Sequence, residues 1–229
     1  NVACARVIIG AGADPGRMVM CDSRGILHRG RTELRETHRE KWELAQKTNA
    51  EGRTGGIPEA MQGMDVVIAL AKPGPGTIKA EWIKAMAPDP VVFACANPVP
   101  EIWPWEAKEA GARVVATGRS DFPNQINNSL GFPGIFRGVL DVRARTITDE
   151  MCIAAAYELA RCAQDKGLDE DHIIPTMDDW EVFPREAAAV GLKAIEQGVA
   201  LRKASRQELL SQAEEIIGRA RRMTADLME

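Results

Sequence analysis

The sequence contains few of the residues from which metal sites and covalent crosslinks are built. Its three histidines are scattered, and none of its five cysteines forms a CxxC pair. A structural zinc site needs closely spaced Cys or His ligands, so we predict none. An odd number of widely spaced cysteines also argues against a disulfide framework. We expect reduced thiols that act as small core residues. These are Cys4, Cys21, Cys95, Cys152 and Cys162.

The chain also lacks a positive charge excess and any long apolar run. Its 29 basic residues are outnumbered by 33 acidic ones, and the net charge is −4. Nucleic-acid binding is not expected as the main role, because contacts to phosphates need a basic surface. No run approaches the roughly 18 apolar residues of a membrane span. The apolar start NVACARVIIGAG has no basic region before it, which argues against a secretory signal. We expect a cytoplasmic protein without membrane or nucleic-acid partners.

What the sequence does contain is an alternation of apolar runs and helix-favouring stretches. The apolar runs are residues 18–21, 66–70, 91–95 and 114–116, and the helical stretches are residues 32–48, 79–87 and 104–110. Short apolar runs separated by helices are typical of a parallel sheet covered on both faces. The predicted fold class is therefore α/β, with a doubly wound, Rossmann-type parallel sheet in a domain over residues 1–146.

Beyond about residue 148 the pattern is helical only. Residues 147–203 are expected to form a helical C-terminal part of the same domain, and residues 204–229 an amphipathic helical tail. Ser205 followed by Glu208 predicts a capping box at the start of the tail. Two interpretations of the tail stay open, one in which it packs on its own domain and one in which it contacts another subunit.

A glycine-rich segment near the start resembles a dinucleotide-binding fingerprint, namely Gly10-Ala-Gly12-Ala-Asp-Pro-Gly16. The residues that follow it do not fit that motif. Pro15 and Gly16 leave no room for the phosphate-binding helix, and Asp22 follows Gly10 by far less than the usual separation of roughly 20 residues. We interpret residues 1–9 as the end of the first Rossmann helix, residues 10–16 as its C-terminal loop and residues 18–22 as the second strand. The first strand and its glycine loop are then expected before residue 1.

Asp22 ends the predicted second strand. A carboxylate in this place accepts hydrogen bonds from the ribose hydroxyls of the cofactor and repels a 2′-phosphate, which favours NAD over NADP. The alternative is an ordinary turn residue in the segment DSRG. Arg24 is close enough in sequence to pair with a 2′-phosphate, so NADP stays an alternative cofactor.

Two loops rich in asparagine follow predicted strands directly. The segment ANPVP (residues 96–100) follows the run at 91–95, and the segment GRSDFPNQINN (residues 118–128) follows the run at 114–116. Carboxyl ends of parallel strands are where open α/β sheets bind ligands. Neutral amides bind carboxylates, hydroxyls or a nicotinamide amide without adding charge. The segment KPGPG (residues 72–76) is a third such loop, of less specific composition.

Several long segments around these loops resemble the NAD(P)-binding domain of bacterial malic enzymes. They are VVATGRSDFPNQINNSLGFPGIFRGVLDVRAR (114–145), PVVFACANPVPEI (90–102), CDSRGILHRGR (21–31), IKAEWIKAMA (78–87) and HIIP (172–175). Such motifs in this order are highly specific, and the resemblance extends to about residue 202. It implies an oxidoreductase that converts malate to pyruvate and CO₂ while reducing NAD or NADP, with Mg²⁺ or Mn²⁺ required.

The resemblance also implies roles for individual residues. Asn97 would lie beside nicotinamide and substrate, Asn127 and Asn128 would contact the substrate, and Asp22 would bind the ribose. Asn1 matches the last residue of the family's glycine loop, near the pyrophosphate.

The family's catalytic tyrosine and lysine and its acidic metal ligands belong to a region before the cofactor domain. We therefore expect no catalytic or metal-binding residue in this chain, no activity of the chain alone, and self-association or a partner domain that supplies them. The only tyrosine, Tyr157, is interpreted as core packing, and Asp178 and Asp179 as an exposed loop pair. The alternatives are another two-domain dehydrogenase and a non-catalytic NAD(P)-binding regulatory domain.

Overall fold

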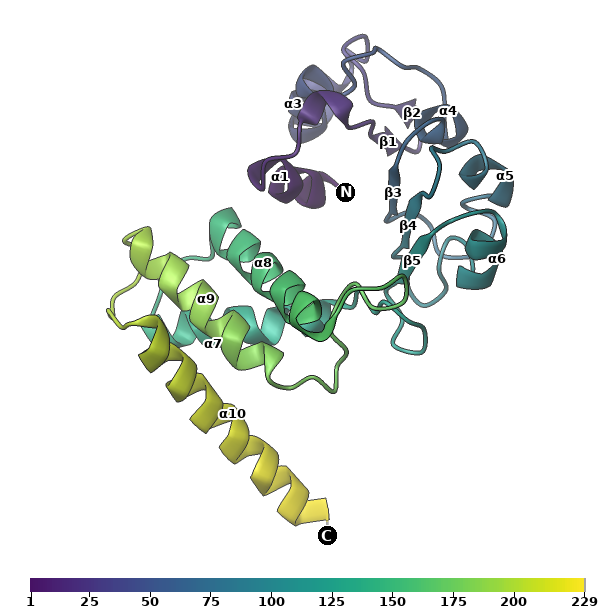
Figure 1. Ribbon diagram of the computed structural model, residues 1–229. Helices are drawn as coiled ribbons and strands as arrows, with labels where there is room; N and C mark the ends of the chain where they lie inside the picture. Colours follow the sequence, from purple (N-terminus) through teal and green to yellow (C-terminus); the bar gives the residue numbers. More distant parts are fainter. Residues whose placement is uncertain (229) are drawn as a thin grey trace. The chain divides into compact units, whose positions relative to one another are not determined.

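The computed structural model describes residues 1–228, which divide into two compact units, the first from Asn1 to Thr117 and the second beginning at Gly118 (Figure 1). This division after Thr117 does not coincide with the domain limits predicted at residues 146 and 203. Those limits remain predictions. None of the helices in the described part of the chain is both long and apolar enough to cross a membrane.

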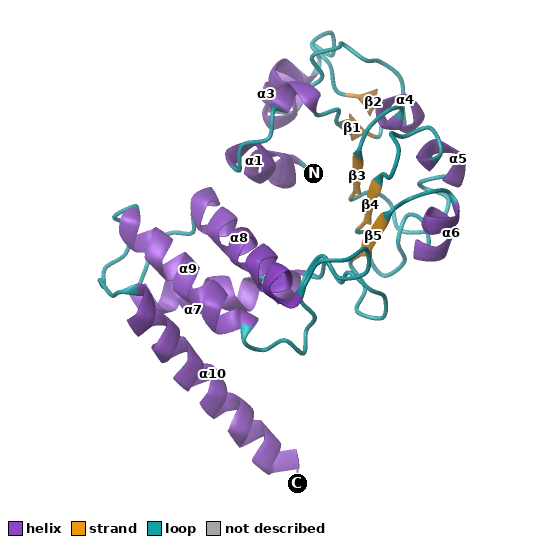
Figure 2. Cartoon of the chain, viewed as in Figure 1, coloured by secondary structure: helices purple, strands orange, loops and turns teal. Residues whose placement is uncertain are grey.

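The first unit is built on a parallel sheet of strand order β3-β4-β5 (Figure 2). The strands are β3 (Val66–Ala69), β4 (Val91–Ala94) and β5 (Val114–Thr117), and the helices that alternate with them are α4 (Ile57–Met61), α5 (Ala80–Ile83) and α6 (Pro104–Glu109). Val66 pairs with Val91 and Val91 with Val114, so all three strands start and end level. The alternation predicted for this region is confirmed, although α5 is shorter than the predicted helix.

Helices α4, α5 and α6 cover one face of the sheet. Side chains alternate between the two faces of a strand. Ala69, Val92 and Val115 point inward and pack against Met61 of α4, Ile83 of α5 and Ala107 of α6. On the opposite face, Val66 and Ile68 are 46% and 40% exposed. The structure thus shows a small parallel sheet with helices, consistent with part of a Rossmann-type domain; a doubly wound sheet is not shown.

The segment before β3 departs from the predicted parallel sheet. It contains α1 (Val2–Gly10), η1 (Pro15–Arg17), β1 (Cys21–Asp22), β2 (Gly25–Ile26), α2 (Leu34–Thr37) and α3 (Arg39–Lys47). The predicted strand at 18–22 is wrong as a member of that sheet, because β1 pairs only with β2, in antiparallel fashion. Among the described residues no parallel neighbour lies beside it. The carbonyl groups of Met18 and Met20 instead accept from the amides of Asn49 (2.8 Å) and Leu27 (2.7 Å).

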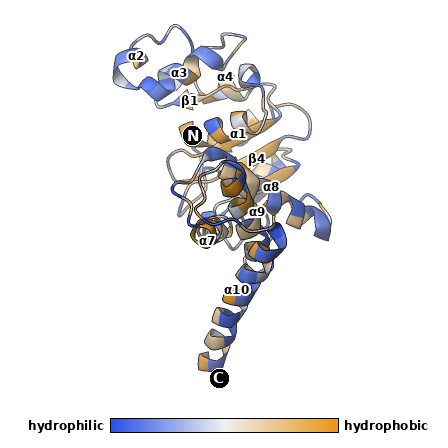
Figure 3. Cartoon of the chain, turned by 90° about the vertical axis from the view of Figure 1, so that its left-hand side faces the viewer, coloured by the Kyte–Doolittle hydropathy of each residue, from blue (hydrophilic) through white to orange (hydrophobic). Residues whose placement is uncertain are grey.

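The second unit is helical and consists of η2 (Asn128–Leu130), α7 (Phe132–Val142), α8 (Asp149–Lys166), α9 (Val182–Glu196) and α10 (Arg206–Met228). Its core contains Val142, Met151, Ala188 and Leu209, one from each long helix. The predicted capping box of the tail is confirmed, since the amide of Ser205 donates to Glu208 Oε2 at 2.7 Å. The start of α10 is packed into the core. Toward its C-terminal end, hydrophilic and hydrophobic residues are mixed along the ribbon in Figure 3, and Met223, Leu227 and Met228 are exposed.

Two expectations about single residues need correction. Tyr157 is exposed rather than packed in the core, because α8 turns Met151, Ala155 and Glu158 inward and Tyr157 lies away from that face. Of the five cysteines predicted as core residues, only Cys162 is buried; Cys21, Cys95 and Cys152 are partly exposed and Cys4 is exposed.

Helices α7 and α9 approach each other closely at Gly138. A Cβ added to Gly138 would lie 2.9 Å from Val190 Cβ and closer still to the carbonyl oxygen of Ala187. Real Cβ atoms do not approach backbone oxygens so closely, so the helices depend on this glycine for their contact.

We expect Gly138→Ala to lower the free energy of unfolding by about 1–3 kcal/mol, because the helices must separate to admit the methyl group. Chemical denaturation measures this. The matched control is Gly218→Ala on α10, where the new Cβ meets only the end of the Arg222 side chain at 3.3 Å. That control should stabilise the helix by up to about 1 kcal/mol. A neutral effect of Gly138→Ala would contradict the close packing.

Candidate functional site

In the first unit, the loops that follow β3 and β4 are joined by a buried carboxylate. Glu101 is 0% exposed. Its Oε1 accepts from the amide of Ala71 at 2.7 Å, and its Oε2 accepts from the amide of Ala96 at 3.0 Å. Ala71 lies just after β3, and Ala96 lies between β4 and Asn97. Two of the predicted ligand loops, those after β3 and β4, are therefore linked by this side chain.

Asn97 lies on the surface beside this bridge. Its residue is exposed, and within residues 1–228 its side chain makes no hydrogen bond. The Asn97–Pro98 peptide bond is cis. An amide without an internal partner is available to a ligand, both as donor and as acceptor.

In the second unit, the neighbouring asparagines Asn127 and Asn128 differ in their surroundings. Asn127 Oδ1 accepts from the amide (3.0 Å) and hydroxyl (2.7 Å) of Ser129, and its Nδ2 donates to the Gly118 carbonyl at 3.0 Å. The side chain of Asn128 is exposed and has no hydrogen-bond partner in the part of the chain that the structure describes. Asn127 thus closes the loop on itself, whereas Asn128 is open to a ligand.

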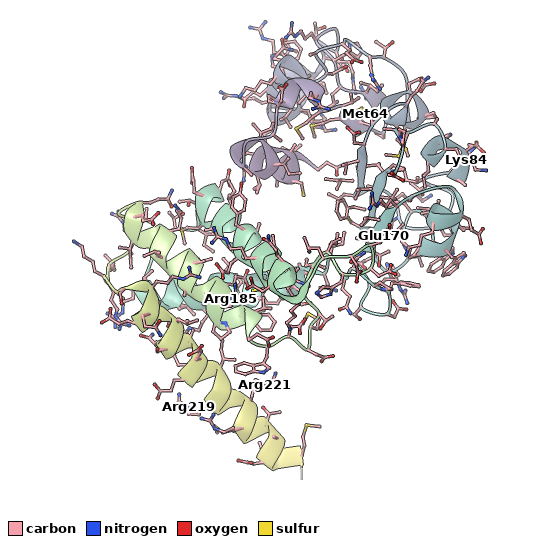
Figure 4. All side chains as sticks on the ribbon, viewed as in Figure 1. Met64, Lys84, Glu170, Arg185, Arg219 and Arg221 are labelled. Atoms are coloured by element: carbon pink, nitrogen blue, oxygen red, sulfur yellow. The ribbon has the colours of Figure 1, made fainter. Side chains whose placement is uncertain are left out.

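Asn124 anchors the same loop from inside. It is buried with a left-handed φ of 55°, which asparagine tolerates better than most residues. Its Nδ2 donates to the Glu170 carbonyl at 2.8 Å, and its Oδ1 accepts from the Ile173 amide at 2.9 Å; Glu170 is labelled in Figure 4. No role was predicted for Asn124 itself, since both of its partners are distant in the chain.

Asp22, the predicted ribose ligand, is held by two cations. Arg31 donates to Asp22 Oδ1 at 2.8 Å and Lys41 donates to Asp22 Oδ2 at 2.9 Å, and the carboxylate side chain is 13% exposed. Burial by itself would raise the pKa of Asp22, but the hydrogen bonds from Arg31, Lys41 and the Arg24 amide outweigh it and hold the pKa well below its usual range. Asp22 is therefore ionised at neutral pH, and its charge is compensated.

Asn1 stands at the start of α1 as its N-cap, exposed and without a capping hydrogen bond from its side chain. The amide groups of a helix N-terminus favour anions, which suits the predicted place near a pyrophosphate. That role stays a prediction.

Glu186 on α9, which no sequence motif singled out, is 0% exposed beside Gly134 of α7. Neither of its carboxyl oxygens has a hydrogen-bond partner among residues 1–228. Burial raises the pKa of Glu186 to about 9, so the carboxyl group carries a proton at neutral pH.

This burial predicts a dependence of stability on pH. Between the ordinary pKa of 4.5 and the raised value of about 9, the unfolded chain releases the proton while the folded chain keeps it. The contribution of Glu186 to the free energy of unfolding is thus fully present below the lower value and falls with pH, by about 1.4 kcal/mol per pH unit. Relative to wild type, Glu186→Gln should gain stability as the pH rises from about 5 to about 8.

Urea denaturation at several pH values measures the difference. The exposed Glu214→Gln on α10 is the control, for which the difference from wild type should not change with pH. Parallel curves for wild type and Glu186→Gln would contradict the protonated state of Glu186.

No group of three or more His, Cys, Asp or Glu side chains suited to a metal ion is found among residues 1–228. The interpretation of Asp178 and Asp179 as an exposed pair is confirmed for Asp178 but wrong for Asp179, whose side chain is 18% exposed. Asp179 accepts from the amide (2.7 Å) and hydroxyl (3.0 Å) of Thr176 and pairs with Lys166, so its role is local. The expectation that metal ligands belong to a preceding region stays a prediction.

The small parallel sheet with its alternating helices is consistent with part of a Rossmann-type NAD-binding domain. Comparison with known proteins is more specific: residues 11–195 match the family described as malic enzyme, NAD binding domain. The chain belongs to the malic enzyme family.

Curated relatives include the bifunctional malic/malolactic enzyme of Bacillus subtilis (strain 168), which is 46% identical over 80% of this chain and 44% of its own length. The NAD-dependent malic enzyme of Geobacillus stearothermophilus is 44% identical over 87% of this chain and 40% of its own length. The NADP-dependent malic enzyme of Halomonas elongata is 39% identical over 88% and 49%. This chain therefore spans less than half the length of each of these relatives.

Among solved structures, Entamoeba histolytica malic enzyme superposes with a TM-score of 0.97 and 52% identity, covering 100% of this chain and 47% of that one. Malic enzyme from Pyrococcus horikoshii Ot3 gives a TM-score of 0.89 and 46% identity, covering 97% and 52%. Both matches include the helical tail, which the sequence resemblance left unmatched.

Proposed function

We propose that this chain is the cofactor-binding part of an enzyme that oxidises malate and decarboxylates the product to pyruvate and CO₂, with reduction of NAD or NADP. The observation that carries the proposal is Asn97, an exposed amide that follows β4 and has no partner within residues 1–228. In the second unit, Asn128 is likewise an exposed amide that is open to a ligand. The family match supports the same reaction. We also propose that this enzyme is cytoplasmic.

The residues present fit a nicotinamide dinucleotide. Gly74 (φ 120°) and Gly76 (φ 90°) have open space where a side chain would be, which allows close approach of a ligand to the backbone. Gln125 Oε1 is a buried acceptor without a partner in the described residues, in the same loop as Asn128. A bound nicotinamide would supply the hydride acceptor for malate oxidation, and Asn97 would orient its amide group.

The two adjacent asparagines would then have different roles. Asn128 would donate to the substrate carboxylate, whereas Asn127 would hold the loop through Ser129 and Gly118. A hydrogen-bond donor in a fixed place orients the substrate so that its reacting carbon lies close to the hydride acceptor. A neutral amide does this without adding charge beside that carbon. The acid, base and divalent metal ion would be supplied by another part of the enzyme.

The proposal is tested in the full-length protein by malate-dependent reduction of NAD and NADP in the presence of Mn²⁺. We expect metal-dependent turnover, and a loss of about 10- to 100-fold in kcat/KM for Asn128→Ala, as for removal of one hydrogen bond to a charged group. The control is Gln207→Ala, an exposed amide on α10, which should leave turnover unchanged. A folded protein that binds a cofactor but does not oxidise malate would favour the regulatory-domain alternative.

For the cofactor, we propose that NAD is preferred and NADP is accepted. Asp22 is negative, which disfavours a 2′-phosphate, but Arg31 and Lys41 compensate much of that charge. The repulsion is then weaker than a lone carboxylate would produce.

Asp22→Asn should therefore lower the preference for NAD, because Arg31 and Lys41 lose a counter-charge and attract the 2′-phosphate. We expect the ratio of kcat/KM for NAD to that for NADP to fall by about tenfold, which corresponds to about 1.4 kcal/mol. Glu43→Gln, which removes the same charge from an exposed position on α3, should leave the ratio unchanged. An unchanged ratio in Asp22→Asn would exclude Asp22 from cofactor selection.

We further propose that the protein works as a homo-oligomer. On α7, the large apolar residues Phe132, Phe136 and Leu140 recur at each turn of the helix and are exposed. An apolar stripe of this kind is typical of a surface that another chain or domain covers.

A further inference from the structure

Glu101 differs from the other buried acidic residues in what it binds. Glu158 of α8 is 1% exposed and pairs with Arg185 and Arg206. The carboxylate of Glu101 has no cation partner within residues 1–228, and its hydrogen bonds come from two main-chain amides. Burying a carboxylate without a cation partner is energetically unfavourable. We therefore expect that the two main-chain amides at this position need both oxygens of Glu101 as acceptors.

The two amides belong to loops that are far apart in sequence. Ala71 precedes the glycine loop at 72–76, and Ala96 precedes Asn97. Two further bonds join the same loops, from the Gly74 amide to the Val99 carbonyl and from the Ile78 amide to the Glu101 carbonyl, each 3.2 Å long. The carboxylate is the only one of these links that reaches the residue directly before Asn97.

We propose that Glu101 is a positioning residue for the nicotinamide site: it holds the Ala96 amide and thereby fixes the place of the Asn97 side chain relative to the glycine loop. This inference rests on the proposed function of Asn97 as a cofactor ligand. Glu101 itself is buried and does not contact the ligand; it acts through Asn97.

The chemistry of the bridge explains why the residue is glutamate. Both of its oxygens face N–H donors, so a glutamine would place its own NH₂ group against one of the amides and leave that donor unpaired. Aspartate keeps the charge and both acceptors, but it is one methylene shorter and cannot span both loops. Each substitution should release one loop while the strands stay paired.

The test is a double-mutant cycle in the full-length enzyme, with Glu101→Gln and Asn97→Ala singly and together. Two quantities are measured, kcat/KM for malate oxidation and the dissociation constant of NADH from its fluorescence. We expect Glu101→Gln alone to reduce kcat/KM by about 10- to 100-fold and to weaken NADH binding. In the Asn97→Ala background the same substitution should cost less than about threefold, because the residue it positions is gone.

Glu106→Gln is the matched control, since Glu106 also accepts from a main-chain amide, that of Trp103 at 3.2 Å, but lies in the first turn of α6. It should leave both quantities near wild type. Hydrogen exchange adds a readout that does not depend on activity: peptides covering residues 70–76 and 95–99 should exchange faster in Glu101→Gln and not in Glu106→Gln.

The outcomes separate the two proposals. Absence of malate oxidation in the wild type would remove the proposed function, while unchanged hydrogen exchange in both loops would remove the bridge. Full additivity in the cycle, with Glu101→Gln equally harmful with and without Asn97, would show a general structural role and overturn the positioning proposal. If Glu101→Gln does not fold, Glu101→Asp takes its place in the same cycle, and the same additivity would overturn the proposal.

Discussion

The parallel pairing of β3, β4 and β5 is the constraint on which the rest of the first unit depends. Because the strands run in the same direction and in level register, the loops that follow β3 and β4 emerge at one edge of the sheet. Only this arrangement allows Glu101 to accept from amides of both loops, and it places Asn97 at the surface next to the glycine loop. The candidate site is thus a consequence of strand direction, completed by one buried side chain.

The buried carboxyl groups of the two units have different kinds of partner. Glu101 binds main-chain amides and joins loops, while Glu158 binds arginines from its own helix, from α9 and from α10 and so joins the helices of the second unit. Glu186 has no such partner among the described residues and remains protonated instead. The same chemical group is therefore stabilised in three ways, by hydrogen bonds from amides, by ion pairs and by loss of its charge.

Local patterns account for the parts of the fold that were predicted correctly. The strands at β3, β4 and β5 are short apolar runs bounded by loops, and the tail helix begins at a capping box, Ser205 and Glu208. The failure at residues 18–22 has a different origin, because a strand exists only where a neighbour pairs with it. Tyr157 was misplaced since one residue along a helix changes the face by about 100°.

The sequence alone determined the family, the strands of the sheet and the amides that follow two of them, because these depend on motifs and periodicities within short segments. Only the tertiary structure decided that Asn127 closes its own loop while Asn128 stays open, that Asp22 is compensated by Arg31 and Lys41, and that Glu101 links two loops. The bonds of Ala71 to Glu101 and of Asn124 to Glu170 span 30 and 46 residues. Partners so distant in the chain meet only through the packing of strands and helices, which no local pattern records.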